Sequence, residues 1–160
     1  MVPASGNTPW HSDLPSNADS RLATLLDFWL TARDHTHDVP NREQFTPFTL
    51  RPWLGYISIY EAVDQGRDFY NRLEGTRITG ITGEDWTHRR ASEVDARFGS
   101  NLVADMTKSI ARGAPQIHAI RIFQHEFKTA TRLLLPVRTA LDSPVNQVLL
   151  ALYLDNPAVG

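Results

Sequence analysis

The side chains best suited to metal binding gather in one short polar stretch, RDHTHD, over residues 33–38. It contains His35, His37 and Asp38, which are suitable ligand types for a transition metal. No further ligand follows at a fixed distance, and the stretch runs into Pro40, as a turn often does. We therefore interpret it as a solvated turn and predict no metal site.

The other residues that could do chemistry are scattered along the chain. The remaining histidines are His11, His88, His118 and His125. A Ser nucleophile needs a His base and often sits in a Gly-x-Ser-x-Gly turn, and the sequence has no such turn. It also lacks a glycine-rich phosphate loop ending in Lys-Ser or Lys-Thr, and the His-Glu-x-x-His zinc motif. We predict a protein without enzymatic activity and without catalytic residues.

One enzymatic alternative stays open. A small α+β fold shaped like a cone can perform isomerisation or dehydration with an Asp-His pair in a deep pocket. Here Asp85 or Asp105 would supply the carboxylate. Burial of either one beside a His, with a raised pKa, would favour this alternative, and an exposed position for both would count against it.

Composition excludes several other classes of protein. A chain of 160 residues that is 41% hydrophobic can bury a core of its own, and its net charge of −2 does not suit a nucleic-acid-binding surface. The absence of cysteine excludes disulfides, thiol nucleophiles and thiolate-bound metals. No apolar stretch approaches the roughly 20 residues of a membrane span, and the N-terminus does not resemble a secretory signal. We expect a cytoplasmic protein whose partners include neither nucleic acid nor membrane.

The N-terminal region divides into a leader and a helix. Residues 1–18 are rich in Pro, Ser, Gly and Asn without periodicity, so we predict a flexible leader. Asp19 or Ser20 can cap the helix that follows, which ends near Arg33. Large apolar residues lie on more than one side of this helix, which favours self-association of two copies. They are Leu22, Leu25, Leu26, Phe28 and Trp29.

The rest of the chain alternates between strand and helix patterns. Residues 54–63 and 69–74 have the alternation of half-buried strands, and glycines then divide residues 75–86 into short helical turns. A single amphipathic helix is predicted from Ser92 or Asp95 to about Arg112, and strands over 116–123, 127–137 and 145–154. This order predicts an α+β fold: a five-stranded antiparallel sheet covered on one face by short helices and one longer helix, with an N-terminal helix.

The run RLEGTRI followed by GEDWT resembles a bacterial branch of the PAS-domain family that carries a Tyr-Arg-Leu-x-Gly-Thr signature. The matching residues are Arg72, Leu73, Gly75 and Thr76. The resemblance extends over roughly residues 22–155, and it implies one PAS-like domain over residues 19–156 with a sensory or regulatory role in bacterial signalling. PAS photoreceptors that attach flavin or a cinnamoyl group use a Cys, so neither chromophore is expected here. Haem is not expected either. PAS proteins that bind haem through a histidine commonly take this ligand from the long helix, and the residues of that helix include no His here.

The signature also predicts roles for single residues. The family usually has an aromatic residue where this chain has Asn71, which points inward between Phe69 and Leu73. A buried amide costs on the order of 1–3 kcal/mol without a partner, so Asn71 needs a side chain, a water or a ligand to bind. We interpret Arg72 as structural, paired with an acid such as Glu61 or Glu74, and Gly75-Thr76 as a chain reversal and a helix cap.

A ligand cavity is expected between the sheet and residues 75–86. The candidate lining residues are Tyr56, Phe69, Asn71, Ile78, Ile81, Trp86, Met106 and Phe123. We expect a small molecule, a protein partner or both to bind there. A scaffold domain whose cavity is filled by side chains is the remaining alternative.

Overall fold

The computed structural model describes residues 8–34, 38–122, 128–140 and 142–157. Its centre is one five-stranded sheet in which the strands follow the order β2-β1-β5-β4-β3, and every neighbouring pair is antiparallel. The strands are β1 (Ile57–Val63), β2 (Asp68–Leu73), β3 (Gln116–Arg121), β4 (Thr129–Arg138) and β5 (Val145–Leu154). The predicted α+β fold with an open antiparallel sheet is confirmed.

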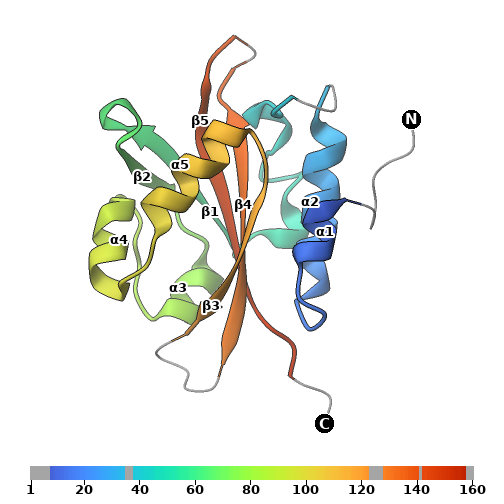
Figure 1. Cartoon of the computed structure of the whole chain (residues 1–160), viewed down its shortest axis with the longest axis vertical. Coiled ribbons are helices and arrows are strands. Elements are labelled where there is room, and N and C mark those ends of the chain that lie inside the picture. Colours follow the sequence, from blue (N-terminus) through green and yellow to red (C-terminus); the bar gives the residue numbers. More distant parts are fainter. Residues whose placement is uncertain (1–7, 35–37, 123–127, 141, 158–160) are drawn as a thin grey trace.

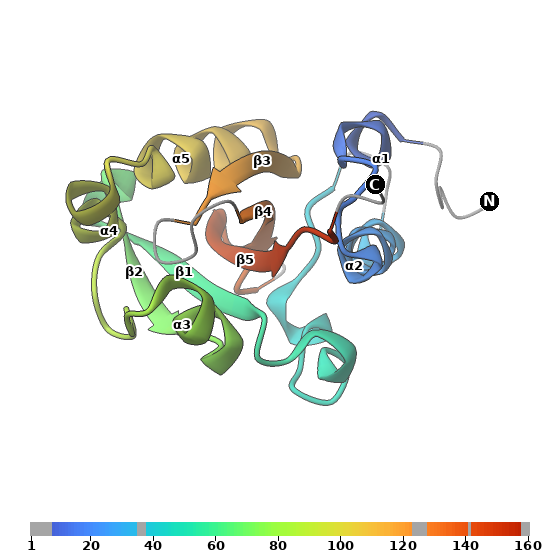
Figure 2. The same cartoon turned by 90° about the horizontal axis from the view of Figure 1, so that it is seen from below.

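Helices cover both faces of this sheet. On one side lie α3 (Thr76–Thr82), α4 (Ala91–Phe98) and α5 (Leu102–Arg112), and on the other α1 (Pro9–Asp13) and α2 (Ser20–Ala32) (Figures 1 and 2). Short 3-10 turns occur at Arg42–Gln44, Arg51–Trp53 and Asp64–Gly66. None of the helices in the described part of the chain has the length and apolarity needed to cross a membrane.

Alternation along the central strands divides the core into two parts. Along β5, Leu149, Ala151 and Tyr153 face α2, whereas Val148, Leu150 and Leu152 face α3, α4 and α5. We call these the α2-side core and the α5-side core. Because successive strand residues point to opposite faces, a strand buried on both faces must be almost continuously apolar, as VNQVLLALYL is.

The large side chains of α2 belong to the α2-side core. Leu22, Leu25, Leu26 and Trp29 are completely buried, and the indole of Trp29 donates to the carbonyl oxygen of Pro136 at 2.8 Å. Phe28 is half-buried against the rings of Phe45 and Trp53. These side chains are covered within the monomer, so they do not form the exposed surface expected for self-association, which itself stays a prediction.

The structure differs from the expected flexible leader in residues 8–18. Thr8 caps α1, and the ring of Trp10 packs edge-on against Trp29 with 6.4 Å between centroids. His11 Nε2 lies 2.7 Å from Asp27 Oδ1. So short a helix is marginal by itself and depends on docking, which local sequence patterns do not reveal. Residues 1–7 lie outside the described residues.

The single long helix predicted from Ser92 or Asp95 is wrong, because Gly99 divides it into α4 and α5. Gly99 has a left-handed φ of 66° and ends α4. The carboxylate of Asp95 then accepts from the backbone N–H groups of Leu102 at 2.6 Å and Val103 at 3.0 Å. Asp95 therefore caps the second helix from within the first, and the two meet at an angle (Figure 1).

Replacing Asp95 tests whether this cap stabilises the division into α4 and α5. We expect Asp95→Ala to lower the free energy of unfolding by about 1–2 kcal/mol, because two helical N–H groups lose their acceptor. Urea denaturation measures the change. Asp142→Ala, which removes an exposed carboxylate, should stay within about 0.5 kcal/mol of the wild type. Equal losses from both variants would contradict the capping role.

The Gly-Thr pair of the signature fixes the start of α3. A Cβ atom on Gly75 would overlap the carbonyl oxygen of Gly55 and lie 2.9 Å from that of Ile57. The Gly55 carbonyl instead accepts from the N–H groups of Arg77 at 2.8 Å and Ile78 at 3.2 Å. Gly75 therefore occupies the cap position expected for Thr76, and a backbone carbonyl replaces a capping side chain.

Two glycines of this segment provide a matched test. Gly75→Ala should lower the free energy of unfolding by at least about 2 kcal/mol, because the new methyl group forces the start of α3 away from Gly55. Gly80→Ala lies inside α3 with no atom within 4 Å of the added carbon. It should stabilise the protein by about 0.5–1 kcal/mol through helix propensity. Denaturant titrations of both variants check the opposite signs, and equal effects would refute the close approach.

Candidate functional site

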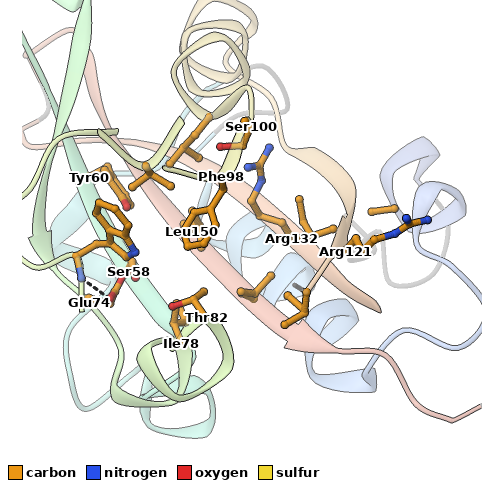
Figure 3. Close-up of a pocket in the computed structure, with 18 residues that line it drawn as sticks. Ser58, Tyr60, Glu74, Ile78, Thr82, Phe98, Ser100, Arg121, Arg132 and Leu150 are labelled. Atoms are coloured by element: carbon orange, nitrogen blue, oxygen red, sulfur yellow. Dashed lines mark hydrogen bonds between the residues drawn. The ribbon is translucent and has the colours of Figure 1, made fainter. Parts of the chain in front are cut away.

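A pocket of about 300 Å³ opens between the sheet and the helices α3, α4 and α5. Figure 3 shows its lining residues. Its walls are mainly aromatic and aliphatic, and include Ile78, Trp86, Phe98, Leu102, Leu150 and Leu152. This volume is at the lower end of small-molecule sites, so the pocket suits a small and largely apolar ligand.

Strand alternation decides which sheet residues reach the pocket. In β1, Ile57 and Ile59 belong to the α2-side core, so Ser58 and Tyr60 turn to the opposite face and line the pocket. In β4, Leu133 is likewise taken up by the α2-side core, and Arg132 lines the pocket. Three polar side chains thus enter an otherwise apolar cavity from the sheet.

Two of the eight predicted cavity residues, Ile78 and Trp86, line this pocket. Four others are buried nearby without lining it. They are Phe69, Asn71, Ile81 and Met106. Tyr56 instead stacks on Tyr153 of the α2-side core, with 4.2 Å between ring centroids. Phe123 lies outside the described residues.

Among the signature residues, Arg72 has the predicted structural partner: its guanidinium binds Glu61 of β1, with Nε 3.0 Å from Oε2. The expectation that Leu73 points inward is wrong, because its side chain is exposed. The pairing of β1 with β2 shifts register between Ile59 and Tyr60, so the alternation of β2 is interrupted before Leu73.

Asn71 is completely buried, as predicted, yet it is only partly satisfied. Its Nδ2 lies 3.5 Å from Oε1 of Glu74, and its Oδ1 has no partner among the described residues. Glu74, which lines the pocket, also accepts from the Trp86 backbone N–H at 2.7 Å and the Thr79 hydroxyl at 3.0 Å. Burial raises the pKa of Glu74, and these hydrogen bonds oppose the rise.

Three buried groups of the pocket lining have no hydrogen-bond partner within the described ranges. They are the hydroxyl of Ser58, the indole Nε1 of Trp86 and Nε of Arg132. Each can donate a hydrogen bond, and the indole and guanidinium nitrogens cannot accept one. The wall of the pocket therefore contains three donors that lack an acceptor among the described residues.

Arg132 also joins Asp105 of α5 and His118 of β3. Its terminal nitrogen lies 2.5 Å from Oδ2 of Asp105 and 3.0 Å from Nδ1 of His118. His118 Nε2 lies 3.6 Å from Asp105 Oδ1. Burial lowers the pKa of His118, and the charge of Arg132 lowers it further. A neutral His118 can accept from the guanidinium at Nδ1, which leaves Asp105 and Arg132 as the ion pair.

Comparison with known proteins now identifies the family. The family model for the PAS domain matches residues 18–150. The chain belongs to the PAS-domain family. No curated protein matches it. The match covers α2 and all five strands except the end of β5, so the pocket lies almost entirely within the recognised PAS domain.

The enzymatic alternative required a cone-shaped fold, whereas this chain has the PAS fold. Asp85 is exposed, and the hydroxyl and N–H of Thr87 lower its pKa. Asp105 does lie beside a histidine, but the guanidinium of Arg132 binds both. His35 and His37 lie outside the described residues. Within the described ranges, no three His, Asp or Glu side chains are placed to hold a metal ion.

Sequence reasoning missed the polar residues of this PAS pocket, above all Arg132. The available signal was an arginine inside the apolar run TRLLLPV, where the neighbouring strand positions are buried. A charged residue there is almost never buried without partners. Its partners Asp105 and His118 are separated from it in sequence, so the pattern alone did not connect them.

The raised pKa of Glu74 predicts a pH dependence of stability. An acid with a raised folded pKa binds more protons when folded, so its contribution to stability is present at low pH and lost as the pH rises through the folded pKa. The stability of the wild type relative to Glu74→Gln should therefore fall as the pH rises above the ordinary value of 4.5.

Urea midpoints of both proteins between about pH 4 and pH 7 measure this difference. Glu93→Gln is a control for which the stability difference from the wild type should change with pH in the opposite direction. Hydrogen bonds from the Arg90 N–H and the Arg89 side chain lower the pKa of Glu93. A pH-independent difference between the wild type and Glu74→Gln would contradict the effect of burial.

Proposed function

We propose that this PAS domain is a non-enzymatic sensory or regulatory module that binds a small, largely apolar molecule in the pocket between the sheet and α3, α4 and α5. The family supports a role in signalling. One observation carries the choice of site: three buried donors that have no partner among the described residues belong to the lining of one largely apolar pocket.

The energetics of buried polar groups support this proposal. A buried donor that lacks an acceptor costs about 1–3 kcal/mol, and most such groups in folded proteins find a partner. A ligand that carries acceptor atoms on an apolar body would satisfy one or more of these donors and cover the surrounding side chains. Ligand binding would thereby tighten the packing of α3, α4 and α5 on the sheet.

Signal output through association with another chain is part of the proposal. Because the large side chains of α2 are buried, any partner of this side of the domain would contact other residues, and exposed Phe48 and Leu54 are candidates. The bacterial branch of the family and the cytoplasmic location stay predictions from the sequence. A scaffold without a ligand remains the competing function, because the pocket is small.

Closing the pocket at its rim tests the function. Ala119 of β3 lines the pocket and is exposed, so Ala119→Trp can fill the opening without disturbing the core. Ala104→Trp adds the same ring to an exposed position of α5 that does not line the pocket. Native mass spectrometry of each protein would report a retained molecule, and NMR titration with small apolar fragments would report binding.

We expect the wild type and Ala104→Trp to bind, and Ala119→Trp to lose at least tenfold in affinity because the added ring, of roughly 150–250 Å², competes for the pocket. Absence of both a retained molecule and any fragment binding to the wild type would favour the scaffold function. Unchanged binding by Ala119→Trp would place the site elsewhere.

A further inference from the structure

The pocket has a polar end beside the place where β1 meets the end of β2. Figure 3 places Ser58, Tyr60 and Glu74 together there, on one side of Leu150 and Phe98. We call this side the Glu74 end. Because all three polar residues line the pocket, a ligand seated there would lie beside groups that can form hydrogen bonds.

A bulge in β2 creates this end. The pairing of β1 with β2 shifts between Ile59 and Tyr60, and Arg72 is the extra residue of β2. Residues three positions apart lie on opposite faces of a regular strand, but the bulge turns Asn71 and Glu74 toward the same face. Glu74 thereby joins the lining of a pocket that is otherwise largely apolar.

Glu74 has one carboxylate oxygen with unused capacity. Oε2 accepts from the Trp86 backbone N–H at 2.7 Å and from the Thr79 hydroxyl at 3.0 Å. Among the described residues, Oε1 has only a long contact of 3.5 Å with Nδ2 of Asn71. Glu74 also forms no ion pair with any residue that the structure describes. Oε1 can therefore accept a further hydrogen bond from a neutral donor.

The same end contains donors that lack an acceptor in the described part of the chain. They are the hydroxyl of Ser58 and the indole Nε1 of Trp86, whose residues are 1% and 5% exposed. The backbone bond to Glu74 places Trp86 beside this end. Burial raises the pKa of Tyr60, so its hydroxyl stays neutral there. Unused donors and an unused acceptor thus lie close together.

Resting on the proposed function, we infer that the ligand is a neutral amide on an apolar ring, with its carbonyl at Ser58 and Trp86 and its N–H at Glu74 Oε1. An amide combines an acceptor and a donor in one small group. A carboxylate would bring a second negative charge beside Glu74, and an amidinium would place a donor against the indole N–H. Elsewhere in the lining, Arg132 is already paired with Asp105, so it does not call for an anion.

Four probes with the same ring and nearly the same shape test the amide: benzamide, acetophenone, benzoate and benzamidine. NMR titration of the full chain should show the tightest binding for benzamide. Acetophenone keeps the carbonyl but has a methyl group in place of the amide nitrogen, so it should bind about threefold to tenfold more weakly. Benzoate and benzamidine are ions at neutral pH and should bind at least about tenfold more weakly than benzamide.

Glu74→Gln tests the acceptor. The new side-chain oxygen must still accept from the Trp86 N–H, so the new nitrogen takes the place of Oε1 and offers a donor instead. The preference for benzamide over acetophenone should then fall to about twofold or less. A preference that stays at the wild-type value would overturn the contact with Glu74.

Ser58→Ala tests the carbonyl contact. The hydroxyl has no partner within the described ranges, so its loss should leave the fold intact. Benzamide and acetophenone should both weaken about threefold to tenfold, with their ratio unchanged. Ser20→Ala removes an exposed hydroxyl of α2 outside this lining and should change neither affinity. Equal results from the two serine variants would overturn the carbonyl contact.

The remaining outcomes separate the amide from the proposed function. If Glu74→Gln fails to fold, the order of the probes and Ser58→Ala still decide. Equal binding of all four probes, with loss of all four in Ala119→Trp, would overturn the amide and leave the proposed function standing. Tightest binding of either ion would do the same. Binding of no probe to the wild type also overturns the amide, and the proposed function fails with it only if no retained molecule and no other fragment is found.

Discussion

Burial of both faces of the central strands is the constraint on which the rest of this structure depends. β1, β5 and β4 lie in the middle of the sheet, so apolar side chains project from them in both directions. Each face must be kept from water, and no single layer of helices can do this for both. The α2-side core and the α5-side core are the two results.

The two sides meet this constraint differently. On one side, α2 is a regular helix of thirteen residues, and most of its large side chains are completely buried in the core. On the other side, three helices of seven, eight and eleven residues cover the sheet in pieces, and the first two end at Gly83 and Gly99. Short helices that meet at angles leave more space than one continuous helix, and the pocket lies in that space. The ends of α3 at Gly83 and of α4 at Gly99 therefore leave room for a pocket on this PAS sheet.

The polar groups of the pocket are the exceptions to the apolar pattern of the central strands. Ser58 and Arg132 occupy strand positions that face the α5-side core, where a wholly structural role would favour an aliphatic side chain. Arg132 is retained there with an acid and a histidine from two other elements to hold it. Such an arrangement costs stability unless its donors are used, and the proposed ligand site rests on this cost.

The sequence by itself determined the strands and their antiparallel α+β arrangement, because strand alternation is a local pattern, and the family model confirms its resemblance to PAS domains. It also predicted a cap of α2 at Asp19 or Ser20, which the structure assigns to Asp19, and the need of buried Asn71 for a hydrogen-bond partner. Only the tertiary structure decided that Gly99 ends one helix and Asp95 caps the next, that Trp10 docks on Trp29, and that Leu73 turns outward.

The tertiary structure alone also brought Arg132, Asp105 and His118 together, with Arg132 in the lining of the pocket. The physical reason is the same in each case. These contacts join residues far apart in the chain, or depend on a register shift between strands, and their free energy arises from packing and desolvation that exist only once the two faces of the sheet are covered.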